Sequence, residues 1–268
     1  MFRSYLSSIS LRQLPLSIRH ISTKRRELDA VIFDVDGTLI DSVDYHAKTW
    51  HDALEYYNIK SNLSDVRMQI GKAADQLLPV FATDEQIKKY SEDIKARKAK
   101  LFKDNYLHKV KPFPGVRQLF ELIKQRNIPI ALASSAASDE LELYKNIANV
   151  SDLIDCQTSS NSKDVKRSKP YPGRNPIKFP SISIISFVIL DIFLAALKLL
   201  KNPPNNRVVV IGDTPWDAQA AKLKIVGVLC GGFDEKLLRE SGCTWIYRDI
   251  IELTKNYDQV TKDILQIK

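Results

Sequence analysis

Short apolar runs alternate with amphipathic stretches across most of this chain, and this alternation limits its fold more than any other feature. Runs such as "AVIF" and "VVVIG" are short and almost wholly apolar, which is typical of strands buried on both faces of a sheet. Strands that alternate with helices predict an α/β fold with a parallel sheet. The expected strands are 30–35, 128–134, 153–156, 207–213 and 225–230, and the expected helices are 116–125, 139–148, 191–200, 216–223 and 234–240.

The chain from Asp41 to about Leu107 interrupts this alternation, because its apolar residues recur at helical intervals and no strand pattern appears. Thr83 precedes one such stretch and Gln86 follows three residues later, which is the spacing of a capping box. The turn residues "KPFPG" at 111–115 mark the return to the alternating pattern. We therefore expect a helical block inserted between the first two strands of the sheet.

Four groups of polar residues fall at or just beyond the carboxyl ends of expected strands or in a loop between them. Ligands bind at this edge in open α/β sheets. In an extended strand end, the side chains of Asp34 and Asp36 point the same way, so their carboxylates can address one centre. The groups are "DVDG" with Asp34 and Asp36, Ser134, Lys169 before a proline, and "GDTPWD" with Asp213 and Asp217.

These residue types suit phosphate chemistry on a metal ion. Oxygen ligands of this kind are preferred by Mg²⁺, which also shares the phosphate of a substrate. Carboxylates alone would repel a phosphate, and a divalent cation with a lysine reverses that repulsion. A carboxylate can then act as the nucleophile and form an acyl phosphate.

The motifs "DVDGTLIDS", "ALASS", "SKP" and "GDTPWD", in this order, resemble the four signature motifs of the haloacid dehalogenase (HAD) superfamily. Within it, the pattern is similar to the phosphoglycolate phosphatase and β-phosphoglucomutase type, whose helical cap follows the first motif. The resemblance covers about residues 28–250 and implies a Rossmann-like parallel-sheet core with helices on both faces and an inserted α-helical cap. The implied boundaries are 28–43 and 112–268 for the core and 44–111 for the cap.

The resemblance also implies a role for each motif residue. Asp34 would be the nucleophile, and Asp36 would protonate the leaving group and then activate water. Ser134 would hydrogen-bond a phosphoryl oxygen, although Ser135 could take this part. Lys169 would offset charge on the nucleophile and the phosphate.

The implied metal is Mg²⁺, held by Asp34, the main-chain carbonyl of Asp36, and Asp213. Asp217 would anchor this set or bind through water. In related caps a specificity loop carries substrate contacts, which makes Lys72 a candidate substrate-binding residue, with a solvated lysine as the alternative.

Two further polar or aromatic residues of the helical block are expected to be structural. For His46 we favour a structural or capping role over metal ligation, because no second histidine lies at metal-ligand spacing. Trp50 is expected in core packing.

The first residues of the chain differ from the rest in charge. Residues 1–26 hold six basic residues and no acid, and the remainder carries 34 basic against 32 acidic residues. The net charge of +8 is therefore local and does not predict a nucleic-acid-binding face. An Arg- and Ser-rich head without acids is typical of a mitochondrial transit peptide, which makes the matrix the expected location. A disordered basic tail on a cytoplasmic protein is the alternative for residues 1–27.

An anomalous acid-free run separates the third motif from the helix that should follow it. Removing residues 173–190 gives "SKPYPDIFLAALKLL", in which the motif continues directly into the helix. We interpret the run as a retained intron or a gene-model error, with a true insertion loop as the rival, since loop closure cost grows only slowly with length. Its apolar part, 182–190, is too short to span a bilayer, and no membrane partner is expected.

The expected function is a Mg²⁺-dependent phosphatase of a small phosphorylated metabolite, acting through an aspartyl-phosphate intermediate. A phosphomutase is the nearest alternative, because it would use the same two aspartates. A dehalogenase needs neither Asp36 nor the acids of "GDTPWD". The alternative of another class is a binding protein without activity, or an isoform that the 173–190 run disables.

Overall fold

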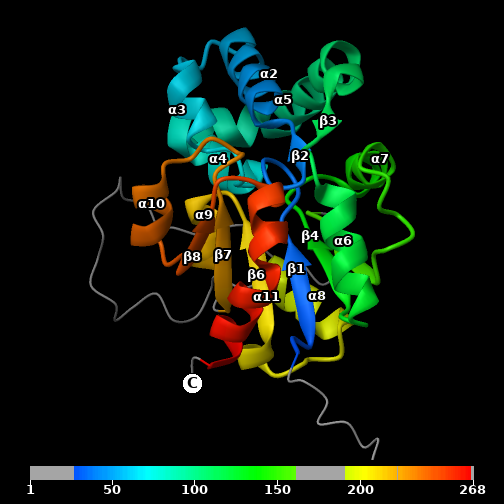
Figure 1. Cartoon of the computed structure of the whole chain (residues 1–268). Coiled ribbons are helices and arrows are strands. Elements are labelled where there is room, and N and C mark those ends of the chain that lie inside the picture. Colours follow the sequence, from blue (N-terminus) through cyan, green and yellow to red (C-terminus); the bar gives the residue numbers. More distant parts are fainter. Residues whose placement is uncertain (1–26, 161–190, 222, 267–268) are drawn as a thin grey trace, which may run out of the picture.

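The computed structural model describes residues 27–160, 191–221 and 223–266. Six parallel strands form one sheet in the order β5-β4-β1-β6-β7-β8 (Figure 1). The first strand lies near the middle, where Val31 pairs with Ile130 on one side and Val209 on the other. The strands are β1 (Ala30–Phe33), β4 (Ile130–Ala133), β5 (Cys156–Thr158), β6 (Val208–Gly212), β7 (Lys224–Val228) and β8 (Trp245–Tyr247).

Helices cover both faces of this sheet, as the alternating pattern predicts. Successive residues of β1 point to opposite faces, so that Val31 and Phe33 pack in one core and Ala30 and Ile32 in the other. In Figure 1, α6 (Val116–Gln125) and α11 (Ile250–Gln266) lie before the sheet, and α8 (Asp191–Leu199) and α9 (Pro215–Ala220) lie behind it. The remaining helices of this unit are α7 (Ser138–Ile147) and α10 (Glu235–Glu240), with the short 3₁₀ turn η3 (Asn205–Arg207).

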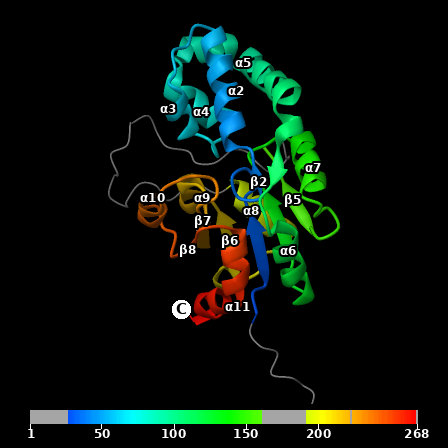
Figure 2. The same ribbon diagram turned by 45° about the horizontal axis from the view of Figure 1, so that its top comes forward.

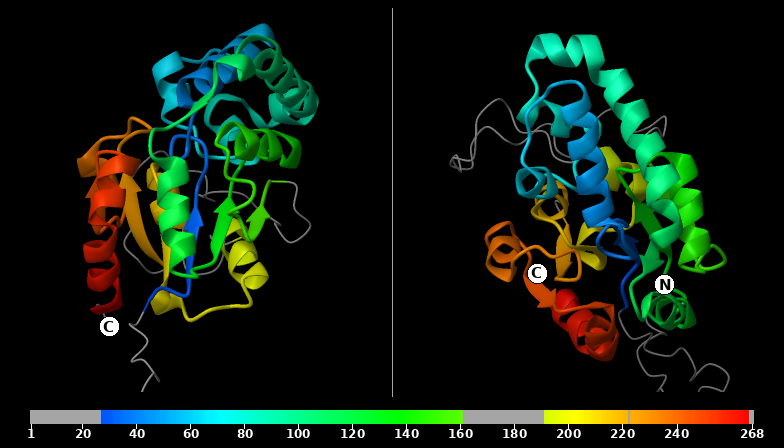
Figure 3. Two further views of the ribbon diagram at one scale, coloured as in Figure 1. Left: turned by 45° about the vertical axis from the view of Figure 1, so that its right-hand side comes forward. Right: turned by 90° about the horizontal axis from the view of Figure 1, so that it is seen from above.

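A second, helical unit stands over the carboxyl edge of the sheet (Figures 2 and 3). It has its own apolar core, in which Trp50 is buried among Leu54, Leu77 and Ile94. Two short strands join the units, because β2 pairs antiparallel with β3. The elements are β2 (Ile40–Asp41), α2 (Val43–Tyr56), α3 (Leu63–Arg67), α4 (Ala74–Phe81), α5 (Asp84–Asn105), η2 (Leu107–Lys109) and β3 (Lys111–Pro112).

The fold class expected from the sequence is confirmed, and its details differ in a few places. The capping box of Thr83 and Gln86 is present at the start of α5. The first strand ends at Phe33, so Asp34 and Asp36 lie in the loop after it and not in an extended strand end. Two elements, β8 and α11, extend the core beyond the helices expected from the sequence.

Three of the sequence predictions fall outside the described residues: the head 1–26, Lys169 and the run 173–190. Within the described ranges, none of the helices is both long enough and apolar enough to cross a membrane.

Candidate active site

Three buried carboxylates meet at the carboxyl edge of the sheet. Asp34 follows β1, while Asp213 follows β6 and Asp217 lies in the first turn of α9. One carboxylate oxygen from each lies within 4.8 Å of the other two. None of the three residues is more than 4% exposed. Since negative charges this close repel one another strongly when buried, the arrangement calls for a cation.

A threonine and a helix cap position these acids. The hydroxyl of Thr38 lies 3.2 Å from Oδ2 of Asp34 and 2.8 Å from Oδ1 of Asp213, so it ties the first loop to the end of β6. Asp217 accepts hydrogen bonds at Oδ2 from both the amide and the hydroxyl of Thr214, at 3.1 and 2.7 Å. The bond from the Thr214 amide, together with the bond that the Asp217 amide donates to the Thr214 hydroxyl, forms the capping box that begins α9. One oxygen of Asp217 is therefore committed to the helix start.

The backbone around Asp213 leaves room only for glycine. A Cβ added to Gly37, whose φ is +85°, would lie 2.2 Å from Oδ2 of Asp213, and one added to Gly231 would lie 1.7 Å from the same oxygen. The loops that contain Gly37 and Gly231 therefore approach the carboxylate of Asp213 so closely that any residue with a Cβ would collide with it. Carboxylate oxygens in a glycine-lined cradle fit a hard divalent cation such as Mg²⁺.

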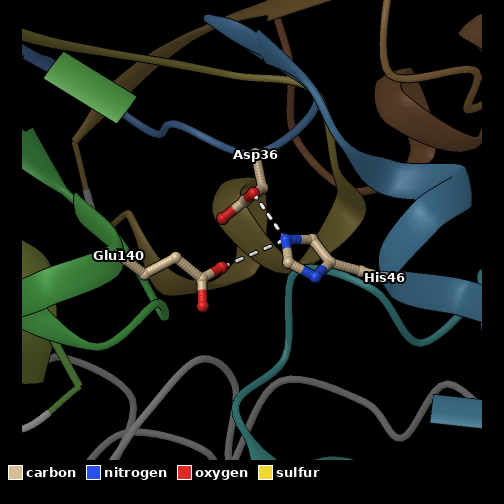
Figure 4. Close-up of side chains that lie close together, drawn as sticks. All are labelled: Asp36, His46 and Glu140. Atoms are coloured by element: carbon tan, nitrogen blue, oxygen red, sulfur yellow. Dashed lines mark hydrogen bonds and ion pairs between the residues drawn. The ribbon is translucent and has the colours of Figure 1, made fainter. Parts of the chain in front are cut away.

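The carboxylate of Asp36 belongs to a neighbouring cluster with His46 of α2 and Glu140 of α7 (Figure 4). Its Oδ1 accepts from the Ser42 hydroxyl at 2.5 Å and lies 2.9 Å from Nε2 of His46. The same nitrogen is 3.3 Å from Oε1 of Glu140. Both acids therefore face one edge of one imidazole ring.

The surroundings of this cluster hold Asp36 as an anion. Burial raises the pKa of Asp36, but the charge and hydrogen bond of His46, the Ser42 hydroxyl and the charge of Lys98 together lower it to about 2. Tyr144 lies 2.9 Å from Nε2 of His46 and donates to Oε1 of Glu140 at 2.8 Å. Burial, followed by the charges of Asp36 and Glu140, raises the pKa of Tyr144 well above its ordinary value, so its hydroxyl keeps its proton.

Two serines follow β4, and the second of them contacts the helical unit. Ser134 is fully buried, and its Oγ accepts from the amide of Ala136 at 3.0 Å, which leaves its own hydroxyl hydrogen free to donate. Ser135 donates to the carbonyl of Gly71 at 3.0 Å. Lys72 is the next residue of the same loop and is buried, with its Nζ 4.0 Å from the centre of the Trp216 ring.

The structure thus brings together the predicted acids Asp34, Asp213 and Asp217, and it places Asp36 beside them in a separate cluster. Residues that the sequence did not assign to the site surround these acids. One sequence feature could have indicated His46, because it is a polar residue on the face of α2 that carries the buried apolar residues. Glu140 carried none, since an acid in the first turn of a helix is ordinary. The unassigned residues are Thr38, Ser42, His46, Glu140 and Tyr144.

Comparison with known proteins agrees with the motifs. A sequence profile of the haloacid dehalogenase-like hydrolases matches residues 28–223. The phosphorylated carbohydrates phosphatase of Thermotoga maritima is 29% identical over 80% of this chain and 92% of its own length. The mitochondrial (DL)-glycerol-3-phosphatase 1 of Arabidopsis thaliana is 24% identical over 74% of this chain and 62% of its own length. The resemblance inferred from the motifs is confirmed.

A solved structure supports the same relationship. The crystal structure of a hydrolase from Pseudomonas syringae superposes with a TM-score of 0.71, at 28% identity, over 87% of this chain and 99% of that protein. The similarity therefore extends over both the sheet and the helical unit.

Proposed function

Because this chain belongs to the haloacid dehalogenase-like hydrolase family, we propose that it is a Mg²⁺-dependent phosphatase of a small phosphorylated metabolite. The observation that carries this proposal is the buried group of Asp34, Asp213 and Asp217 with Asp36 beside it. The activities in the names of the relatives above support a phosphate monoester as the substrate. Neither a nucleic acid nor a membrane is proposed as a partner.

Asp34, Asp213 and the main-chain carbonyl of Asp36 would hold the ion, with Asp217 anchoring the set or binding through water. When bound, Mg²⁺ offsets the charge of the carboxylates and of the substrate phosphate.

In the first step, a carboxylate oxygen of Asp34 attacks phosphorus and the bond from phosphorus to the ester oxygen breaks. The electron pair of that bond goes to the leaving oxygen, which takes a proton from Asp36. The product of this step is an acyl phosphate on Asp34 and a free alcohol. Ser134 would donate its hydroxyl hydrogen to a phosphoryl oxygen, or Ser135 would, and Lys169 would offset charge.

In the second step, Asp36 removes a proton from water while the water oxygen attacks phosphorus. The bond between phosphorus and Asp34 breaks, and inorganic phosphate leaves. Asp36 is ready for this basic role in its present contacts, because its pKa is about 2. For the acidic role it must gain a proton, so we propose that its carboxylate leaves His46 when substrate is bound.

The organisation of the chain completes the proposal. Residues 28–43 and 112–268 would form the catalytic core, 44–111 the cap, and 173–190 an anomalous insertion in the core. Residues 1–27 would be a transit peptide to the mitochondrial matrix. The composition of the head supports this location, as does the mitochondrial relative from Arabidopsis thaliana.

Hydrolysis of p-nitrophenyl phosphate by the full chain, with Mg²⁺ and with EDTA, tests the activity. We expect turnover in the presence of Mg²⁺ and none in EDTA. Asp34→Asn and Asp36→Asn should each lower kcat by about 10²–10³ or more. Asp52→Asn, an exposed acid of α2, is the matched control and should keep wild-type kcat. Equal activity of the wild type and Asp34→Asn refutes the mechanism.

Three further measurements test the intermediate and the alternative functions. Acid quenching during turnover should trap phosphate on Asp34. Release of inorganic phosphate without a bisphosphate activator argues against a mutase. A chain that lacks residues 173–190 should gain activity if the run disables the enzyme.

A further inference from the structure

Glu140 of α7 has no part in the mechanism above, although it lies in the cluster with Asp36 and His46 (Figure 4). Its side chain is 18% exposed. Oε1 accepts from the Tyr144 hydroxyl one turn along the same helix, at 2.8 Å, and Oε2 lies 3.9 Å from Nζ of Lys98. These contacts hold the carboxylate of Glu140 with Oε1 3.3 Å from Nε2 of His46.

The contacts of His46 indicate which ring nitrogen carries a hydrogen. Nδ1 is buried and has no hydrogen-bond partner within the part of the chain that the structure describes. Nε2 faces Asp36 and Glu140, whose carboxylate oxygens act as acceptors. The hydroxyl oxygen of Tyr144 also lies 2.9 Å from Nε2, but its hydrogen goes to Glu140. Nε2 is therefore the donor, and it has more than one acceptor within reach.

This N–H needs a second acceptor during the reaction. Asp36, at 2.9 Å, is now nearer to Nε2 than Glu140 is, at 3.3 Å. When Asp36 turns from His46 to the leaving oxygen, a buried donor would lose its acceptor, which is costly. Glu140 avoids this cost because its oxygen already lies beside the ring. A carboxylate also accepts more strongly than the neutral hydroxyl of Tyr144.

We propose that Glu140 is a positioning residue that accepts the N–H of His46 when the carboxylate of Asp36 turns to the substrate. This inference rests on the proposed phosphatase activity. The proton stays on Nε2 throughout, and only its acceptor changes. His46 belongs to the helical unit and Glu140 to the sheet unit, so the exchange requires the two units to be docked as they are here. Asp36 is then released for proton transfer only under a closed site.

Two aryl phosphates of nearly the same shape test this role. The leaving group of phenyl phosphate depends on protonation more than that of p-nitrophenyl phosphate does. We expect Glu140→Ala to lower kcat/KM about 10-fold for phenyl phosphate and less than about 3-fold for p-nitrophenyl phosphate. The inhibition constant of inorganic phosphate should stay at its wild-type value, because its binding involves no leaving group.

Two further variants separate positioning from a structural role. Glu140→Gln preserves the shape and keeps an acceptor oxygen, although a weaker one. It should lower kcat/KM for phenyl phosphate by about 3-fold and leave that for p-nitrophenyl phosphate unchanged. In a His46→Asn background, Glu140→Ala should change kcat/KM for phenyl phosphate by less than about 2-fold, because the residue through which Glu140 acts is absent.

A matched control and the contrary outcomes complete the test. Asp139→Ala removes the exposed acid beside Glu140 in the first turn of α7 and should keep wild-type kcat/KM for both substrates. Equal losses for the two substrates in the Glu140 variants, no loss, or an undiminished loss in the His46→Asn background refute the role of Glu140 while the phosphatase stands. If the wild type with Mg²⁺ hydrolyses neither aryl phosphate, both proposals fail.

Discussion

Nε2 of His46 lies 2.9 Å from Oδ1 of Asp36, so a residue of α2, the first helix of the helical unit, directly contacts the proposed acid and base. The imidazole is nearly inaccessible and stacks on Phe102 of α5, with ring centres 4.2 Å apart. Its position is thus set by the helical unit, while Asp36 belongs to the loop after β1. The position of α2 and α5 therefore affects the orientation of the Asp36 carboxylate, which must transfer a proton in the proposed mechanism.

Replacing His46 should impair proton transfer more than binding. Without the imidazole, Asp36 loses one of its orienting donors and keeps Ser42, so we expect His46→Asn to lower kcat by about 10-fold with a smaller change in KM. The loss should be greater for an alkyl phosphate than for p-nitrophenyl phosphate, because nitrophenolate leaves without much help from an acid. His51→Asn on the same helix, which removes a contact with Ser61, is the control. Equal losses for both substrates contradict this role.

Thr38→Val tests the hydroxyl between the two carboxylates. The substitution preserves shape but removes the donor to Asp34 and Asp213, so the acids should hold Mg²⁺ in a less defined geometry. We expect the Mg²⁺ concentration for half-maximal activity to rise several-fold and the free energy of unfolding to fall by about 1 kcal/mol. Thr254→Val on α11, where the hydroxyl donates to the carbonyl of Ile250 in the same helix, should leave the Mg²⁺ titration unchanged.

Gly231→Ala should displace Asp213. The new methyl group would lie 1.7 Å from Oδ2, and the carboxylate must move to admit it. We expect activity to fall by about 10² or more, as when one charge-stabilising group is lost. Gly242→Ala has no atom within 4 Å of the added carbon and differs only by strain at a φ of +115°, so it should lose stability and keep its kcat. Normal kcat in Gly231→Ala would remove Asp213 from the metal site.

Lys72→Met should stabilise the ligand-free protein at neutral pH. The folded-state pKa of about 8 lies below the ordinary 10.5, so the folded chain binds fewer protons than the unfolded chain between these values. The cost of the buried charge is therefore full below pH 8 and disappears as the pH rises through 10.5. We expect a gain of roughly 2–3 kcal/mol in unfolding free energy at pH 7 that shrinks by pH 10. Denaturant titrations at both pH values measure it, and a gain independent of pH contradicts the charge as its cause.

Most of the fold could be predicted from the sequence, because its signals are local. A strand buried on both faces is apolar throughout; β1, β4 and β6 have this pattern, and β7 has it after its first residue, Lys224. The final helix, α11, could also have been predicted, since its buried residues recur at helical spacing. In contrast, β8 has three residues, all half-buried, and its short sequence gives no clear pattern.

The sequence by itself determined that Asp34, Asp213 and Asp217 would gather, because parallel strands bring their carboxyl ends to one edge and the residues follow those strands. Only the tertiary structure decided that Asp36 faces His46 and Glu140, since those residues come from helices of different units. The tertiary structure alone also decided that the ammonium group of Lys72 is buried. Spacing along one element fixes which residues share a face, whereas contacts between elements depend on how the helical unit packs on the sheet.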